Sequence, residues 1–173
     1  DRAAFRAVRC LPGEIAPNVL VPGDPARAAR IAKEWLTDAK LVMVQREFHS
    51  YTGTYNGVPV SVISTGIGSP SAAMVMQDLG KLGCDVVIRV GTAGSCVKEV
   101  KPGDNVVGTA AVRDEGLTRK FVPEIYPAVA NLQVTNALCV AGEKQATQVH
   151  TGIVHTSDSF RSPTLEQDIK TAI

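Results

Sequence analysis

Arginines and glycines recur at the ends of predicted strands, in a pattern suited to binding an anion. Gly23, Gly66 to Gly68 and Gly91 to Gly94 each follow a short apolar run, and Arg27 and Arg89 lie near the first and third of these turns. Glycine lets an anion approach the backbone closely, and a guanidinium offers paired donors that match phosphate oxygens. Because open α/β sheets bind ligands beyond the carboxyl ends of their strands, we expect the three turns to form one oxyanion site.

Each of these features also has a purely structural explanation. A single glycine turn is usually only a turn, and an arginine such as Arg27 more often lies on a solvated helix face. Arg89 interrupts the apolar run from Val86 to Val90, which we expect to be a strand buried on both faces. A charge in such a strand needs a partner, which is either a ligand or a structural carboxylate.

The hydrophobic pattern predicts an α/β fold in a single domain, residues 1–173. Helices are expected after Pro25, after Pro70 and over 132–144. Strands are expected at 18–21, 41–44, 51–55, 58–64, 86–90, 105–112 and 149–156. Asn56 and Gly57 favour a tight hairpin, so a β-meander joins strands that alternate with helices, and the predicted sheet is mixed. The polar stretch 157–173 is expected to end in a weak helix.

Composition and charge exclude several classes of function. The chain has 18 Lys and Arg against 17 Asp and Glu, a net charge of +1, and no basic stripe that could follow a nucleic-acid backbone. Its apolar runs are too short for a transmembrane helix, so we expect a cytoplasmic protein with no membrane partner. The four scattered cysteines form no CxxC pair, and His150 and His155 should face opposite sides of a strand, so no metal cluster is predicted.

The turn from Thr65 to Ala72 also resembles part of the dinucleotide-binding pattern GxGxxG. However, Ser71 replaces the third glycine and Pro70 stiffens the turn. A nicotinamide-dinucleotide enzyme is therefore not favoured.

Five segments between Val19 and Phe160 carry a family resemblance. They are VPGDPARAARIA, QREF, STGIGSPSAA, IRVGTAGS and TSDSF. In this order and spacing they closely resemble the nucleoside phosphorylases of the uridine phosphorylase and hexameric purine nucleoside phosphorylase type. The stretch from Val112 to Val129 is more similar to the uridine branch. The resemblance implies a three-layer α/β/α fold with a mixed, partly barrel-like central sheet.

The same resemblance implies roles for particular residues. Arg89 and Thr92 would be catalytic, and Arg46 would reach into the phosphate site of a neighbouring subunit. The implied phosphate-binding residues are Gly23, Arg27, Arg46, Arg89 and Thr92, and the implied nucleoside-binding residues are Thr92, Ala93, Gly94 and Phe160. The active site would thus be shared within a homo-oligomer, a dimer or a trimer of dimers.

Phosphate would be a co-substrate, and no organic cofactor is implied. Glu47, Ile67 and Ser71 match positions that hold a monovalent cation, such as potassium, between subunits of some uridine phosphorylases. The alternative for Glu47 is an ion pair with Arg46 or another neighbour.

The expected activity is reversible phosphorolysis of uridine to uracil and ribose 1-phosphate. A purine nucleoside phosphorylase, a related nucleosidase and a catalytically inactive nucleoside or phosphate binder remain as alternatives. The chain ends at Ile173, before the family's ribose-binding carboxylate segment, so we expect a C-terminally truncated member. After Phe160, the positions of Arg161 and Gln167 do not reproduce the spacing with which uridine enzymes read the base.

Overall fold

A computed structural model of the chain describes residues 1–145 and 147–159. The chain divides into two compact units, Asp1–Thr92 and Ala93–Ile173. Among the described residues, the first unit contains two α-helices and five strands, and the second contains one α-helix and a pair of strands. In the described part of the chain, no helix is both long enough and apolar enough to cross a membrane.

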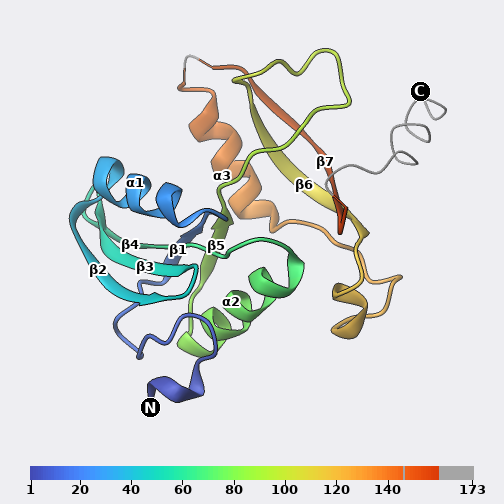
Figure 1. The fold of residues 1–173 in the computed structure, drawn as a ribbon. Coiled ribbons are helices and arrows are strands. Elements are labelled where there is room, and N and C mark those ends of the chain that lie inside the picture. Colours follow the sequence, from blue (N-terminus) through green and yellow to red (C-terminus); the bar gives the residue numbers. More distant parts are fainter. Residues whose placement is uncertain (146, 160–173) are drawn as a thin grey trace. The chain divides into compact units, whose positions relative to one another are not determined.

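A five-stranded mixed sheet organises the first unit, with the strand order β2-β3-β4-β1-β5. β2, β3 and β4 form the predicted antiparallel meander, whereas β1 pairs in parallel with both β4 and β5 (Figure 1). Asn56 and Gly57 join β3 to β4 with φ angles of 48° and 80°, as a tight hairpin requires. The strands are β1 (Asn18–Val21), β2 (Thr37–Gln45), β3 (Phe48–Tyr55), β4 (Val58–Ile63) and β5 (Val86–Arg89).

Two capped helices cover opposite faces of this sheet. In α1 (Pro25–Trp35), the Asp24 side chain accepts a hydrogen bond from the Ala26 amide and so caps the first turn. α2 (Ser69–Leu82) begins after Gly68 and ends at Gly83, whose φ of 76° is readily adopted by glycine. Both helices confirm the sequence prediction.

The core shows how the two helices are separated by the sheet. Val62 packs with Ala28 and Ile31 of α1, whereas the next residue, Ile63, packs with Val75 and Leu79 of α2. Because successive residues of a strand point to opposite faces, α1 and α2 lie on either side of β4. The predicted α/β/α layering is therefore present around the strands that carry the glycine turns.

The N-terminal segment is anchored by a buried carboxylate. Asp78 of α2, 1% exposed, accepts hydrogen bonds from the amides of Ala7 at 2.7 Å, Val8 at 3.0 Å and Arg6 at 3.3 Å. Three backbone donors satisfy a charge that would otherwise be costly to bury. This contact fastens the segment that precedes β1 to the α2 face of the sheet.

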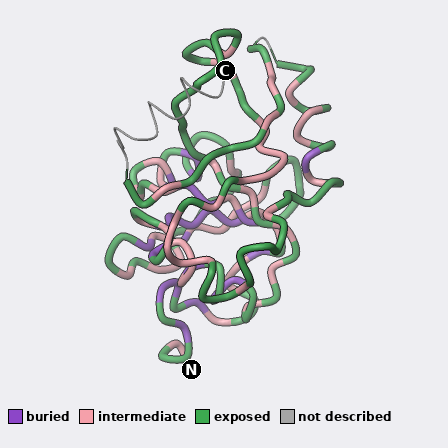
Figure 2. Tube along the Cα trace, turned by 90° about the vertical axis from the view of Figure 1, so that its right-hand side faces the viewer, coloured by how far each residue is buried: buried purple, intermediate pink, exposed green. Residues whose placement is uncertain are grey.

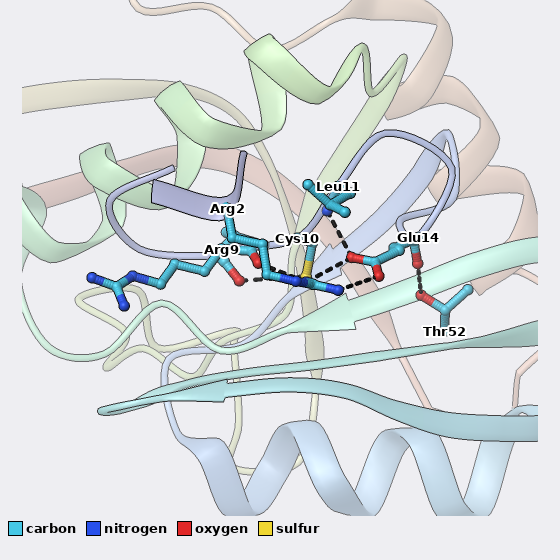
Figure 3. A network of polar contacts seen from close by, with 7 residues as sticks. Arg2, Arg9, Cys10, Leu11, Glu14 and Thr52 are labelled. Carbon is cyan, nitrogen blue, oxygen red and sulfur yellow. Dashed lines mark hydrogen bonds and ion pairs between the residues drawn. The ribbon is translucent and has the colours of Figure 1, made fainter. Parts of the chain in front are cut away.

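A second polar network surrounds Glu14 (Figure 3). The two guanidinium nitrogens of Arg2 donate to its carboxylate at 2.5 and 2.8 Å, and the Leu11 amide donates to it at 2.7 Å. The hydroxyl of Thr52 donates to the Glu14 carbonyl at 2.8 Å. The hydrogen bond from Arg2 is the main reason that the pKa of Glu14 lies below its ordinary value.

The second unit is built on a parallel pair of strands. β6 (Asn105–Asp114) pairs with β7 (Val149–Ser157), and α3 (Leu132–Gly142) packs against both. These elements confirm the sequence prediction, although α3 ends two residues earlier than expected. The short 3-10 helices are η1 (Arg2–Ala4) in the first unit and η2 (Thr118–Lys120) in the second. The predicted helical ending at 160–173 lies outside the described residues.

One prediction about the fold is wrong. We expected a strand over 86–90 buried on both faces, but β5 is the edge strand of the described sheet and Val87 and Arg89 are exposed. β5 packs mainly against its neighbour β1, and in the described chain no helix lies closely over its side chains, so its faces are not enclosed. The buried segments shown in purple in Figure 2 belong mostly to other parts of the first unit.

Candidate functional site

The glycine turns of the first unit meet around the side chain of Arg89. The amide of Gly66 donates to the carbonyl of Gly23 at 2.9 Å, which joins the loop after β4 to the loop after β1. A Cβ on Gly23 would lie 3.5 Å from Nη2 of Arg89, and a Cβ on Gly91 would lie 3.5 Å from its Cζ. The predicted convergence is therefore confirmed for Gly23, Gly66 and Gly91, whereas Gly94 belongs to the second unit.

Arg89 ends β5 and turns its guanidinium toward these loops. Its Nη1 donates to the Val21 carbonyl at 3.2 Å, so the neighbouring strand holds it in place. Although the residue as a whole is exposed, partial burial of the guanidinium lowers its pKa, and the nearby charge of Arg27 adds to this effect. The structure thus brings two cations together against their mutual repulsion.

Arg27 lies in the first turn of α1. Its Nη1 makes one long hydrogen bond of 3.5 Å to the Val90 carbonyl, which leaves most of its donors available. With Asp24, Ala26 and Arg30 it lines a hollow of about 240 Å³ at the start of the helix. The N-terminus of a helix carries a partial positive charge, so this position favours an anion.

Across residues 1–145 and 147–159, neither Arg27 nor Arg89 forms an ion pair with a carboxylate. The sequence left two partners open for Arg89, a ligand and a structural carboxylate. In the described structure no carboxylate pairs with it. Two adjacent guanidinium groups, a helix N-terminus and glycine loops form a site where a dianion would relieve the repulsion between the cations.

Arg46 and Glu47 form the turn between β2 and β3, closed by the pair Gln45 and Phe48. Arg46 has a φ of 53°, a left-handed conformation that costs a non-glycine residue about 1–3 kcal/mol. Its side chain is exposed, and no ion pair with Glu47 exists in the part of the chain that the structure describes. The expected role of Arg46 in a neighbouring subunit stays a prediction.

The side chains of Glu47 and Ser71 both approach Gly66 at the place where another residue would carry its Cβ. A Cβ on Gly66 would lie 2.6 Å from Cγ of Glu47 and 2.7 Å from Oγ of Ser71, so only glycine, here with a φ of 70°, fits between them. Oγ of Ser71 donates to the Thr65 carbonyl at 2.6 Å and makes a longer contact of 3.4 Å with Oε1 of Glu47. Ile67 is 98% exposed.

This cluster bears on the predicted cation site. The side chains of Glu47 and Ser71 supply only oxygen atoms, which suit a hard monovalent cation. Among the described residues no group of three or more His, Cys, Asp or Glu side chains is arranged to hold a metal ion. A cation at this place remains a prediction.

The nucleoside-binding residues are less well defined by the described chain. Thr92 is exposed at the end of the first unit, while Ala93 and Gly94 are exposed in an irregular segment of the second. Phe160 lies outside the described residues. Their predicted roles are therefore not tested.

The second unit contains a larger hollow of about 720 Å³ next to β6. One guanidinium nitrogen of Arg113 donates to the carbonyls of Pro123, Glu124 and Tyr126 at 3.0, 2.6 and 2.6 Å. Arg113 thereby organises the loop at 123–126, and these contacts are structural.

Ser64 and Thr65 also belong to the site, although the sequence pattern did not single them out. The amide of Thr65 donates to the Pro22 carbonyl at 2.9 Å, and the hydroxyl of Ser64 contacts two backbone groups of the β2–β3 hairpin. Both residues were visible in the segment STGIG, but the sequence pattern suggested roles only for its glycines and for Ile67. Polar residues directly after an apolar strand were the signal that could have identified them.

Comparison with known proteins identifies the family. Residues 17–172 match the model of the phosphorylase superfamily. The chain belongs to the phosphorylase superfamily. A uridine phosphorylase of Thermococcus kodakarensis is 44% identical over 153 residues, which cover 88% of this chain and 55% of that protein. A guanosine phosphorylase of Halorubrum lacusprofundi is 34% identical, covering 86% of this chain and 61% of that one.

Solved structures of this superfamily match the fold closely. A uridine phosphorylase from Vibrio fischeri superposes with a TM-score of 0.92 at 30% identity, covering 97% of this chain and 70% of that chain. A purine nucleoside phosphorylase from Toxoplasma gondii, in complex with immucillin-H, gives a TM-score of 0.88 at 32% identity, covering 96% and 69%. These matches confirm the predicted fold class. The chain spans about 55% of the length of the first curated relatives it matches.

Proposed function

We propose that the protein catalyses the reversible phosphorolysis of uridine to uracil and ribose 1-phosphate. The observation that carries this proposal is the pair Arg27 and Arg89, which lie beside glycine loops with no carboxylate partner in the described chain. Uridine phosphorylases among its relatives, at 38–44% identity, support the choice of reaction.

In this reaction phosphate attacks the anomeric carbon of the ribose while the base departs. The sugar passes through a state with oxocarbenium character, so an anion held beneath it is stabilising. Arg89 would orient the phosphate through its forked donors, and Arg27 with the N-terminus of α1 would add positive charge. Fixing the nucleophile in this way replaces a bimolecular encounter by a positioned one.

Thr92 follows the strand that carries Arg89, with two residues between them. Its hydroxyl can both donate and accept a hydrogen bond, so it could contact phosphate and a ribose hydroxyl together. Ala93, Gly94 and Phe160 would line the nucleoside side of the pocket. Arg46 would complete the phosphate site of a second copy, so the active enzyme would be a homo-oligomer.

A monovalent cation would be held by Glu47, Ser71 and the backbone of Ile67. Its contribution would be structural, since it would fix the hairpin that carries Arg46 without taking part in bond making. The reaction needs no organic cofactor.

A purine nucleoside is the second candidate substrate. It is favoured by relatives named guanosine phosphorylase and purine nucleoside phosphorylase, at 34% and 37% identity. The phosphate chemistry would be the same, and only the contacts to the base would differ.

The test is cleavage of uridine and of inosine by the full-length protein, each with and without phosphate. Phosphate-dependent release of uracil is the expected result. Preferential cleavage of inosine would move the assignment to purine nucleosides, and cleavage that ignores phosphate would indicate a nucleosidase. If nucleoside or phosphate stabilised the folded protein without any product, the protein would be a non-catalytic binder.

A further inference from the structure

Ser64 makes an unusual set of contacts immediately after β4. The residue is completely buried, and its amide donates to the His49 carbonyl at 3.1 Å. Its hydroxyl accepts a hydrogen bond from the His49 amide at 2.8 Å and donates one to the Glu47 carbonyl at 2.6 Å. One serine therefore makes three hydrogen bonds to the end of the β2–β3 hairpin.

The register of the sheet explains what the hydroxyl does. β3 and β4 pair regularly up to Ser50 and Ile63, so His49 and Ser64 would form the next pair. In a regular antiparallel ladder, the His49 amide would donate to the backbone carbonyl of Ser64. Here it donates to the side-chain hydroxyl of Ser64 instead. The hydroxyl thus provides an acceptor for the His49 amide, and the backbone of Ser64 can leave the sheet and turn toward the glycine loops.

The turn leads directly to the anion site. One residue later, the Thr65 amide bonds to the Pro22 carbonyl, and then the Gly66 amide bonds to the Gly23 carbonyl, both at 2.9 Å. Ser64 is consequently the point at which the hairpin of Arg46 and Glu47 is joined to the glycine loops around Arg89.

We propose that Ser64 is a positioning residue of the anion site, whose hydroxyl holds the Arg46–Glu47 hairpin in fixed register with the loops of Gly23 and Gly66. The proposal rests on the proposed function, in which Arg46 completes a phosphate site. Arg46 is held in a left-handed conformation, and such a conformation persists only where its surroundings fix it. Without the hydroxyl, the hairpin loses the hydrogen bonds that its His49 amide and Glu47 carbonyl make with Ser64, and Arg46 can relax away from its position.

The strand that precedes Ser64, β4, supplies a matched control. Ser61 is also completely buried, and its hydroxyl accepts a hydrogen bond from the Ala16 amide at 2.8 Å and shares one with Thr52 at 2.7 Å. Ser61→Ala therefore removes the same chemical group three residues earlier, where its hydrogen bonds go to Ala16 and Thr52 and not to the turn at Arg46 and Glu47.

The experiment measures kcat and the KM for phosphate in the full-length wild type, Ser64→Ala and Ser61→Ala. Because a small misplacement of a binding group can cost a large factor in rate, we expect Ser64→Ala to raise the phosphate KM about 10-fold or more. Ser61→Ala should leave the phosphate KM near the wild-type value, even if it lowers stability. Ser64→Cys, which keeps the side-chain size but bonds weakly, should resemble Ser64→Ala.

A double-mutant cycle with Arg46→Ala separates positioning from a general loss of packing. If Ser64 acts through Arg46, Ser64→Ala should change the phosphate KM little once Arg46 has been removed. Equal effects of Ser64→Ala with and without Arg46 would overturn the proposal. So would equal phosphate KM values for Ser64→Ala and Ser61→Ala.

Three further outcomes are decisive. If neither Ser64 variant folds while Ser61→Ala does, the hydroxyl is a requirement of the fold and the proposal fails. If the wild type cleaves no nucleoside with phosphate, the proposed function fails and this inference fails with it. A phosphate-dependent wild type together with an unaffected Ser64→Ala would overturn this inference alone.

Discussion

The two units of the chain bury their apolar side chains to very different degrees. In the first unit, residues such as Val75 and Leu79 are at most 1% exposed and belong to one continuous core. In the second, Ile153 is 70% exposed and Ile125 is 94% exposed, and Thr135 is its one buried residue among those described. The arginines and glycine loops thus lie on the unit with its own core, which suits a site that must hold an anion in a fixed place.

Because the arginine and glycine site lies on the well-packed first unit, the largest effect on activity is expected from removing a charge there. Arg89→Ala should lower kcat/KM for phosphate-dependent cleavage by about 100- to 1,000-fold, because it removes a positioned donor for the developing charge. Steady-state kinetics at varied phosphate concentration would measure this. Lys40→Ala, which removes an exposed charge from β2, is the control and should have little effect. An unchanged phosphate affinity in Arg89→Ala would refute the role of Arg89.

A second prediction concerns packing. Leu79→Ala should destabilise the protein by about 2–5 kcal/mol, because it opens a cavity in the core beneath α2. Ile153→Thr keeps a β-branched residue on an exposed strand and should change the free energy of unfolding by about 0.5 kcal/mol or less. Urea unfolding measures both. Similar losses in the two variants would mean that the second unit is as tightly packed as the first.

The parts of the fold that the sequence predicted follow from local rules. The Asn56–Gly57 hairpin and the cap of α1 are set by residues that are neighbours along the chain. The meeting of the glycine turns also followed, because parallel strands place their carboxyl ends at one edge of a sheet. Local patterns, together with this general rule for parallel strands, were sufficient for these features.

Other features depended on contacts between distant residues. The apolar run 86–90 could not reveal that β5 lies at a sheet edge, since strand order is not encoded in the run itself. Asp78 has the sequence context of a solvated helix residue, yet it is buried by three amides from a segment about 70 residues away. The role of the Ser64 hydroxyl likewise depends on where the β2–β3 hairpin lies.

The cysteines allow a third test of the difference between the units. Burial raises the pKa of Cys10 in the first unit to about 11, whereas Cys96 in the second is exposed. Because the thiolate is the reactive form, a disulfide reagent should modify Cys96 in the native protein and reach Cys10 only after unfolding. Peptide mapping by mass spectrometry would locate the label, and Cys96→Ser should abolish the rapid phase. Equal labelling of Cys10 under native conditions would argue against a closed core.

The smallest expected effect is a dependence of stability on acidity. Arg2 lowers the pKa of Glu14 in the first unit, while the Lys101 amide and then His150 lower that of Asp104 in the second. A carboxyl whose pKa is lower in the folded state stabilises the fold above its unfolded pKa and loses this contribution as the pH falls through the folded pKa. Both contributions should therefore begin to weaken as the pH falls to about 4, near the unfolded pKa values, and disappear below the lower folded pKa values.

Urea unfolding between neutral and acidic pH measures this loss. Glu14→Gln and Asp104→Asn should each be less sensitive to acid than the wild type, by a small amount because both ion pairs are partly exposed to solvent. Parallel pH profiles for the wild type and both variants would show that neither contact contributes.

The central claim is that the arginine and glycine site of the first unit delivers phosphate to a nucleoside. The most direct measurement is the ratio of ribose 1-phosphate to free base when the full-length protein cleaves uridine in the presence of phosphate. The account predicts that the two products form in equal amounts. Release of free base with ribose, and no ribose 1-phosphate, would contradict it.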